Sequence, residues 1–200
     1  MPAMSTVERI FCQSLPWRAF TRRVVFPWAI GNDDLDGYVL ELGSGSGAMA
    51  AALLDRYPSI RLTATDVDPA MRAAAAARVA RFGDRAEVAE ADATRLPFPD
   101  TSFDAVVNFI MLHHVIDWEG ALGEVARVLR PGGLLAGYDL VNAGPNRLLH
   151  RVERSSHRLA TAPALRDRLA QLPFEAVTVT EGLFRTVARF RARRTDGNGT

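Results

Sequence analysis

The sequence predicts a doubly wound α/β fold, in which helices cover both faces of an open, mostly parallel β-sheet. Two observations predict it. Short apolar stretches alternate with helical patterns along residues 38–140, and three alternating glycines directly follow the first apolar stretch. Such alternation is typical of parallel strands joined by crossover helices. Two hundred residues are enough for one domain with a substantial core.

The first predicted strand, residues 38–42, runs into Gly43, Gly45 and Gly47, and a helical pattern follows at 48–57. Glycines at this point let the backbone pass close to a ligand. The first amides of the following helix then face the turn. Gly43-x-Gly45-x-x-Ala48 fits the dinucleotide-binding fingerprint. Taken alone, three glycines also fit a tight turn without a ligand.

The second predicted strand, residues 61–66, ends in Asp66, about 20 positions after the glycines, where a carboxylate that binds a ribose is expected. A solvated strand end is the alternative interpretation. Asp68 is predicted as a helix N-cap, because Pro69 suits the first helical position and residues 70–80 are strong helix formers.

Three further segments follow in order. A strand at 86–91 leads into Asp92-Ala-Thr-Arg-Leu-Pro-Phe-Pro-Asp100. A strand at 103–109 contains Asn108 and is followed by Leu112-His-His114. A predicted helix and Arg127-Val-Leu-Arg-Pro-Gly-Gly133 then precede a strand at 134–140.

In this order, Glu41-Leu-Gly-Ser-Gly-Ser-Gly47, Asp66-Val-Asp-Pro-Ala-Met71 and the three later motifs resemble the class I S-adenosylmethionine-dependent methyltransferases that act on small molecules. The resemblance covers about residues 36–191. It implies a Rossmann-like sheet of seven strands that closes with an antiparallel pair, at about 175–180 and 185–191. It also implies an N-terminal helical cap at 1–35, a helical insertion at about 143–160 and a tail at 192–200.

The same resemblance implies S-adenosyl-L-methionine as the cofactor and a role for each matching residue. The three glycines would pass under the methionine part, and Glu41 would orient the loop and the ammonium group. Asp66 would accept hydrogen bonds from the ribose hydroxyls. The remaining contacts would be Val67, Asp92 and Ala93 at the adenine and Asn108 at the methionine end. Pro131, Gly132 and Gly133 are predicted to form a turn into the fifth strand and to touch no ligand.

His113 and His114 are the candidate general bases, because they follow the fourth strand and imidazole titrates near neutral pH. A packing role is the alternative. The predicted activity is methyl transfer to a small, partly apolar acceptor, and whether O, N or C receives the methyl group stays open. A regulatory or partner protein that binds the cofactor without methyl transfer is the main alternative, and a nicotinamide oxidoreductase is a third.

The composition limits which metals, macromolecular partners and cellular locations are expected. The single cysteine, Cys12, excludes a disulfide framework, and His150 and His157 lack a third metal ligand, so no metal is expected. Neither a signal peptide nor a membrane span stands out, which predicts a cytoplasmic protein. No nucleic-acid partner is expected, because Asn108-Phe-Ile-Met stands where amino-methylating enzymes carry Asn-Pro-Pro-aromatic.

Charge is distributed unevenly along the chain. Residues 32–140 carry 9 arginines against 17 acidic residues, a net charge of −8, whereas residues 141–200 carry 11 against 5, a net charge of +6. Arg147, Arg151, Arg154 and Arg158 recur at helical spacing. An ordinary amphipathic helix explains this spacing. The alternative is a cap, formed with the aromatic and basic segment 14–28, that favours an anionic acceptor or one at a membrane surface, which would place the protein at the membrane periphery.

Overall fold

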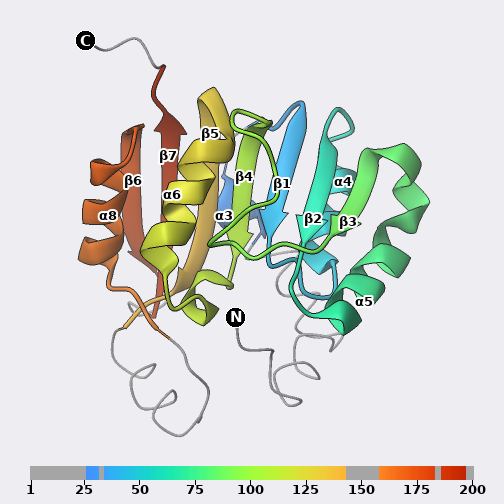
Figure 1. The fold of residues 1–200 in the computed structure, drawn as a ribbon, viewed down its shortest axis with the longest axis horizontal. Coiled ribbons are helices and arrows are strands. Elements are labelled where there is room, and N and C mark those ends of the chain that lie inside the picture. Colours follow the sequence, from blue (N-terminus) through green and yellow to red (C-terminus); the bar gives the residue numbers. More distant parts are fainter. Residues whose placement is uncertain (1–25, 32–33, 143–157, 183–185, 197–200) are drawn as a thin grey trace, which may run out of the picture.

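Five parallel strands and one antiparallel pair form a single seven-stranded sheet in the computed structural model, which describes residues 26–31, 34–142, 158–182 and 186–196 (Figure 1). The strand order is β3-β2-β1-β4-β5-β7-β6. The strands are β1 Tyr38–Leu42, β2 Arg61–Thr65, β3 Ala86–Ala89, β4 Phe103–Phe109, β5 Leu129–Leu140, β6 Phe174–Gly182 and β7 Val187–Arg194. β5 pairs antiparallel with β7, and β7 pairs antiparallel with β6.

Helices connect the strands. They are α3 Phe26–Ile30, α4 Ala48–Arg56, α5 Pro69–Val79, α6 Trp118–Val128 and α8 Ala162–Gln171, with short 3-10 helices η2 Ala80–Arg85 and η3 Leu112–His114. Side chains cap three of these helices at their N-termini. Asp68 accepts from two amides of α5, Asp117 from Gly120 at α6, and Thr161 from Ala164 at α8. None of the described helices is both long and apolar enough to cross a membrane.

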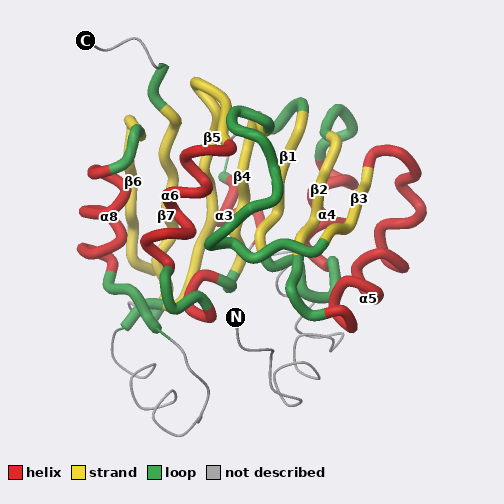
Figure 2. The backbone as a smooth tube through the Cα atoms, viewed as in Figure 1, coloured by secondary structure: helices red, strands yellow, loops and turns green. Residues whose placement is uncertain are grey.

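Two apolar cores lie on opposite faces of the sheet, because alternate strand residues point to opposite faces. On one face α6 and α8 pack on Leu40, Val106 and Leu135. On the other face α3 and α4 pack on residues one position away in the same strands, such as Val39 and Val107. Figure 2 shows the loop after β3 crossing past β2 and β1 toward α6.

The predicted fold class is confirmed, including the seven strands and the C-terminal antiparallel pair. β5 begins earlier than predicted, at Leu129, and its pairing with β4 shifts register between Phe103 and Ala105, so Pro131–Gly133 form an irregularity inside the strand. β7 runs on to Arg194 instead of ending at 191. The predicted tail therefore starts too early, because Ala192 is buried in the core and the Thr195 amide donates to Pro173.

Other predictions fall mostly outside the described residues. This applies to residues 1–25 of the predicted cap and to 143–157 of the insertion, with Arg147, Arg151 and Arg154. The described end of the cap, α3, packs on β5, where the rings of Trp28 and Tyr138 meet edge to face at 5.8 Å. The described end of the insertion, residues 158–160, is not helical.

Asp68 caps α5 through its carboxylate, whose Oδ1 lies 2.8 Å from the Ala70 amide, and this confirms the sequence prediction. Replacing Asp68 with alanine should lower the free energy of unfolding by about 1 kcal/mol, the usual effect of losing an N-cap. Asp68→Asn should lower it less, because the amide oxygen can accept the same hydrogen bonds. Urea denaturation compares the three proteins, and equal losses in both variants would contradict the capping role.

Candidate functional site

The parallel register brings the ends of four strands together at one edge of the sheet. Leu42 at the end of β1 pairs with Thr65 on β2 and with Asn108 on β4, and Asn108 pairs with Gly137 on β5. The chain leaves β1 for β2 on one side and reaches β4 on the other. Ligands of open α/β sheets bind at such a switch point, outside the carboxyl ends of the strands.

The glycine turn lies at this point, between β1 and α4. Gly43, Gly45 and Gly47 all have positive φ, which favours glycine. A Cβ on Gly47 would lie 2.8 Å from the Ala75 backbone, whereas one on Gly45 would meet no atom within 4 Å. Gly47 therefore permits close packing of the turn on α5, whereas none of the described residues packs against the α-carbon of Gly45 on this side.

Asp66 follows β2 and holds the turn directly. Its Oδ2 accepts from the Gly45 amide at 2.9 Å, and its Oδ1 accepts from the Asp68 amide at 2.9 Å. Burial raises the pKa of Asp66, although both amide hydrogen bonds oppose this shift. An ionised carboxylate has about four lone-pair sites, so Asp66 can accept further hydrogen bonds from a ligand.

Polar side chains at the ends of β1 and β4 are buried and have atoms without a hydrogen-bond partner among the described residues. Glu41 is 1% exposed, and its Oε2 is one of these atoms. Burial, and then the nearby Asp66 carboxylate, raise the pKa of Glu41 to about 8. Asn108 is 2% exposed, and neither its Oδ1 nor its Nδ2 has a partner. Leaving such groups unsatisfied is costly, so a ligand that pairs with them would bind favourably.

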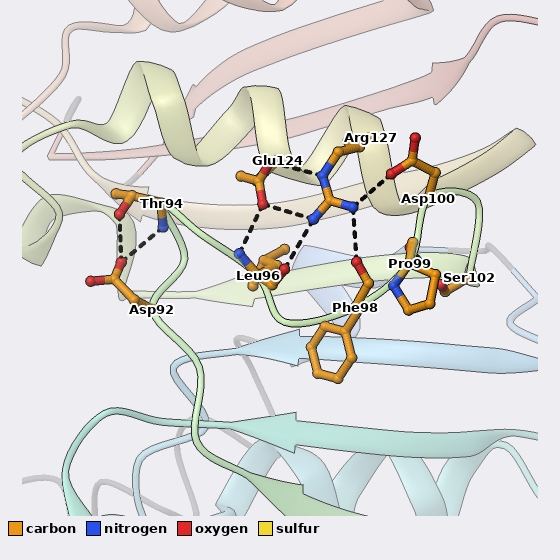
Figure 3. A network of polar contacts seen from close by, with 9 residues as sticks. All are labelled: Asp92, Thr94, Leu96, Phe98, Pro99, Asp100, Ser102, Glu124 and Arg127. Atoms are coloured by element: carbon orange, nitrogen blue, oxygen red, sulfur yellow. Dashed lines mark hydrogen bonds and ion pairs between the residues drawn. The ribbon is translucent and has the colours of Figure 1, made fainter.

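Asp92 and Ala93 follow β3 and begin the loop drawn in Figure 3. Asp92 Oδ1 accepts from the Thr94 amide at 2.9 Å and from the Thr94 hydroxyl at 2.7 Å. Burial opposes ionisation of Asp92, the hydrogen bonds from Thr94 favour it, and the net effect is a lowered pKa of Asp92. Asp92 is therefore an ionised acceptor in a turn of defined shape.

His113 follows β4 and is buried against a carboxylate that the sequence analysis missed. Its Nδ1 lies 2.5 Å from Oδ1 of Asp139, near the end of β5. Asp139 Oδ2 also accepts from the amides of Met111 and Leu112, at 2.8 and 2.5 Å. The ring of His114 lies 4.0 Å from that of His113. An acidic residue near the end of a buried strand, the signal that identified Asp66, could have identified Asp139.

Arg158, which the sequence analysis grouped with three other arginines, binds other residues of this protein. Its guanidinium contacts both carboxylate oxygens of Glu119 and the Ile116 carbonyl, and its amide donates to the His113 carbonyl at 3.1 Å. It therefore anchors the end of the insertion to the segment after β4. The proposed role of the other three arginines toward an anionic or membrane-bound acceptor stays a prediction.

The structure thus gathers most of the predicted site residues at one edge. Glu41, the three glycines, Asp66 and Val67 lie at the ends of β1 and β2 or in the turns after them, and Asn108, His113 and His114 lie at or after the end of β4. Among them, Asp66 and Gly45 share a direct hydrogen bond. Asp92 and Ala93 come from the separate loop after β3.

Comparison with known proteins agrees with this arrangement. Residues 40–137 match the family described as a methyltransferase domain. The chain is 41% identical over 97 residues to the demethylmenaquinone methyltransferase of Thermus thermophilus, an alignment that covers 48% of this chain and 44% of the relative. It is 34% identical over 152 residues to the malonyl-[acyl-carrier protein] O-methyltransferase of Geobacter sulfurreducens, covering 70% of this chain and 57% of the relative. The chain thus spans about half the length of these relatives.

A solved structure gives the same fold. The [4+2]-cyclase SpnF aligns with a TM-score of 0.76 at 22% sequence identity, over 90% of this chain and 84% of its own. These similarities support a class I S-adenosylmethionine-dependent methyltransferase domain. The cofactor that they imply is S-adenosylmethionine.

The residues at the edge fit this cofactor. Among the described residues, the buried Oε2 of Glu41 and the amide of Asn108 have no hydrogen-bond partner, and no atom would lie within 4 Å of a Cβ on Gly45. An ammonium group, a carboxylate and ribose hydroxyls can supply the missing hydrogen bonds and charge. Donors and acceptors that the fold already holds in place reduce the cost of ordering the site on binding.

Glu41 should make the stability of the cofactor-free protein depend on pH. Its pKa is higher in the folded than in the unfolded chain, so its favourable contribution is complete below about pH 4.5 and is lost as the pH rises to about 8. Across this range the unfolding free energy should fall by roughly 5 kcal/mol more for the wild type than for Glu41→Gln. Urea denaturation at several pH values measures this difference, and parallel curves would contradict it.

Proposed function

We propose that this protein transfers the methyl group of S-adenosylmethionine to a small, partly apolar acceptor. One observation carries the proposal most strongly: Glu41 on β1 and Asn108 on β4 flank the glycine turn with buried polar atoms that have no partner in the described part of the chain. Beside them, His113 after β4 is paired with the buried Asp139 of β5. The names of the relatives support a small or carrier-bound acceptor, because one acts on demethylmenaquinone and another on a malonyl-carrier conjugate. The cyclase on the same fold shows why the fold alone is not sufficient evidence.

The cofactor contacts that we propose follow the strand ends. When bound, S-adenosylmethionine supplies an electrophilic methyl group on its sulfonium. Asp66 would accept from the ribose hydroxyls with the lone pairs that the Gly45 and Asp68 amides do not use. Glu41 and Asn108 would pair with the methionine end. Asp92 and Ala93, with Val67, would bind the adenine.

We further propose His113 as the general base for an acceptor that must lose a proton. Asp139 engages Nδ1, and in this proposal Nε2 is the ring nitrogen that takes the proton. The carboxylate stabilises the imidazolium that forms, and it orients the ring at the same time. Asp139 also binds the amides of Met111 and Leu112, so the ring and its backbone are fixed by one buried group. His114, stacked on His113, is the second candidate.

A label-transfer experiment tests the proposed activity. The protein is incubated with methyl-labelled S-adenosylmethionine and a metabolite extract, and S-adenosylhomocysteine and labelled products are measured. We expect both to appear in equal amounts. The variant Asp66→Ala should bind the cofactor more weakly by roughly 1.5–3 kcal/mol. It should therefore reach the same transfer only at a higher cofactor concentration. Tight cofactor binding without any label transfer would instead support a regulatory protein.

The histidines are tested on the product identified by that screen. If the acceptor needs deprotonation, His113→Ala should lower turnover by ~100-fold, the usual scale for a general base, while the dissociation constant of the cofactor stays unchanged. His114→Ala is measured in parallel to decide between the two rings. Wild-type turnover in both variants would assign them to packing.

A further inference from the structure

Arg127, in the last turn of α6, uses all five of its N–H groups in hydrogen bonds (Figure 3). Two go to the carboxylate of Glu124, each at 2.8 Å. One goes to the carboxylate of Asp100 at 2.8 Å. The other two go to main-chain carbonyls of Phe98 and Leu96, at 2.8 and 3.0 Å. Three of the five bonds therefore hold the loop that begins with Asp92.

Glu124 completes the attachment from the same helix. Its Oε2 accepts from the Leu96 amide at 2.8 Å, so α6 binds both the amide and the carbonyl of Leu96. Hydrogen bonds from Arg127 lower the pKa of Glu124, and those to Glu124 raise the pKa of Arg127, so both groups stay charged. Below this attachment, the Leu96 side chain is buried in the core.

The attachment is next to the turn of Asp92. The amide of Arg95 donates to the Asp92 carbonyl at 3.0 Å and closes the turn directly before Leu96. On the far side of Leu96, the ring of Phe98 packs edge to face on Phe103 at 5.1 Å. Fixing Leu96 therefore restricts where Asp92 and Ala93 can lie. The effect is indirect, because Arg127 and Glu124 bind Leu96, Phe98 and Asp100.

Stability alone explains this arrangement poorly. The side chains of Arg127 and Glu124 are 30% and 21% exposed, and partly exposed ion pairs contribute little to folding. Holding a binding loop in place before the ligand arrives has a different benefit, because the loop then loses less entropy on binding.

We propose that Arg127, with Glu124, is a positioning residue for adenine recognition: it holds the loop after β3 so that Asp92 and Ala93 meet the base in one arrangement. The inference rests on the proposed contact of Asp92 with the adenine. In that contact Asp92 accepts a hydrogen bond from the amino group of the base, and the Ala93 amide donates to the ring. A base with a carbonyl in place of the amino group reverses both hydrogen-bonding roles.

Calorimetry with two ligands tests the inference without any acceptor. S-adenosylhomocysteine carries adenine, and S-inosylhomocysteine carries the base with the carbonyl. The wild type should prefer the first ligand by roughly 10-fold or more, the effect of about one good hydrogen bond. In Arg127→Gln we expect binding of S-adenosylhomocysteine to weaken roughly 10-fold and binding of S-inosylhomocysteine to change little, so that the preference is lost.

Arg130→Gln is the matched control, because Arg130 belongs to the same Arg-Val-Leu-Arg motif. Its guanidinium binds both carboxylate oxygens of Asp104, at 2.6 and 2.7 Å, at the start of β4, and its Nε donates to the Thr101 carbonyl at 3.3 Å, at the end of the loop farthest in sequence from Asp92. This variant should keep the wild-type preference. Glu124→Gln keeps the shape of the side chain but not its charge, and this variant should lose part of the preference. If circular dichroism shows that Arg127→Gln does not fold, Glu124→Gln replaces it in the test.

Each outcome has one meaning. Equal weakening of both ligands in the folded Arg127 or Glu124 variants would overturn the inference, since the clamp would then serve the fold alone. An unchanged preference in these variants, together with a lost preference in Asp92→Ala, would also overturn it but leave the adenine contact standing. An unchanged preference in Asp92→Ala would show instead that the proposed adenine contact is wrong, and the inference would fall with it.

Discussion

Burial of carboxylates at the edge where the parallel strands end is the constraint on which the rest of the site depends. The acidic side chains that lie there include Glu41 at the end of β1, Asp66 after β2 and Asp139 near the end of β5. A buried charge is unfavourable unless it is paired or hydrogen-bonded. Backbone amides of the turns after β1, β2 and β4 supply these bonds to Asp66 and Asp139. Satisfying the carboxylates therefore shapes the loops.

Glu41 is the exception, and this links the fold to the cofactor. Its Oε2 has no hydrogen-bond partner among the described residues, and burial raises its pKa, which favours the neutral carboxyl group. The protein thus holds a carboxyl group that is neutral near pH 7, but can ionise, beside the glycine turn. A cationic group that binds there can restore the ionised form, because an opposite charge favours ionisation of a carboxyl group. The feature that costs stability at high pH in the free protein is the one that suits a cationic ligand.

Arginines are the main connectors between segments that are distant in sequence. Arg127 holds the loop after β3, Arg130 holds the start of β4, and Arg158 holds the segment after β4. Guanidinium suits this work because its donors reach several carbonyl or carboxylate oxygens at once. The uneven charge of the chain has a structural counterpart here, since arginines of the basic C-terminal part bind groups of the acidic central part. Arg158 pairs with Glu119, and Arg168 binds the Glu119 carbonyl.

The sequence by itself determined the elements that depend on local patterns. Strand β1 and strand β4 begin and end where predicted, and Asp68 caps α5 as its neighbour Pro69 indicated. The glycine turn could also be predicted, because backbone with positive φ or in close contact with a neighbour favours glycine. These features depend on residues close together in the chain, so the sequence carries the necessary information.

Only the tertiary structure decided the contacts between distant segments. Asp139 lies 26 positions from His113, and Arg127 lies 31 positions from Leu96, so no local pattern joins them. The early start of β5 and the late end of β7 likewise follow from pairing with neighbouring strands, which extends a strand beyond its own apolar pattern. Arg158 shows the same limit: its spacing indicated a helix face, but a carboxylate from another segment determines where its guanidinium lies. Such pairings depend on three-dimensional proximity, which the register of the sheet creates.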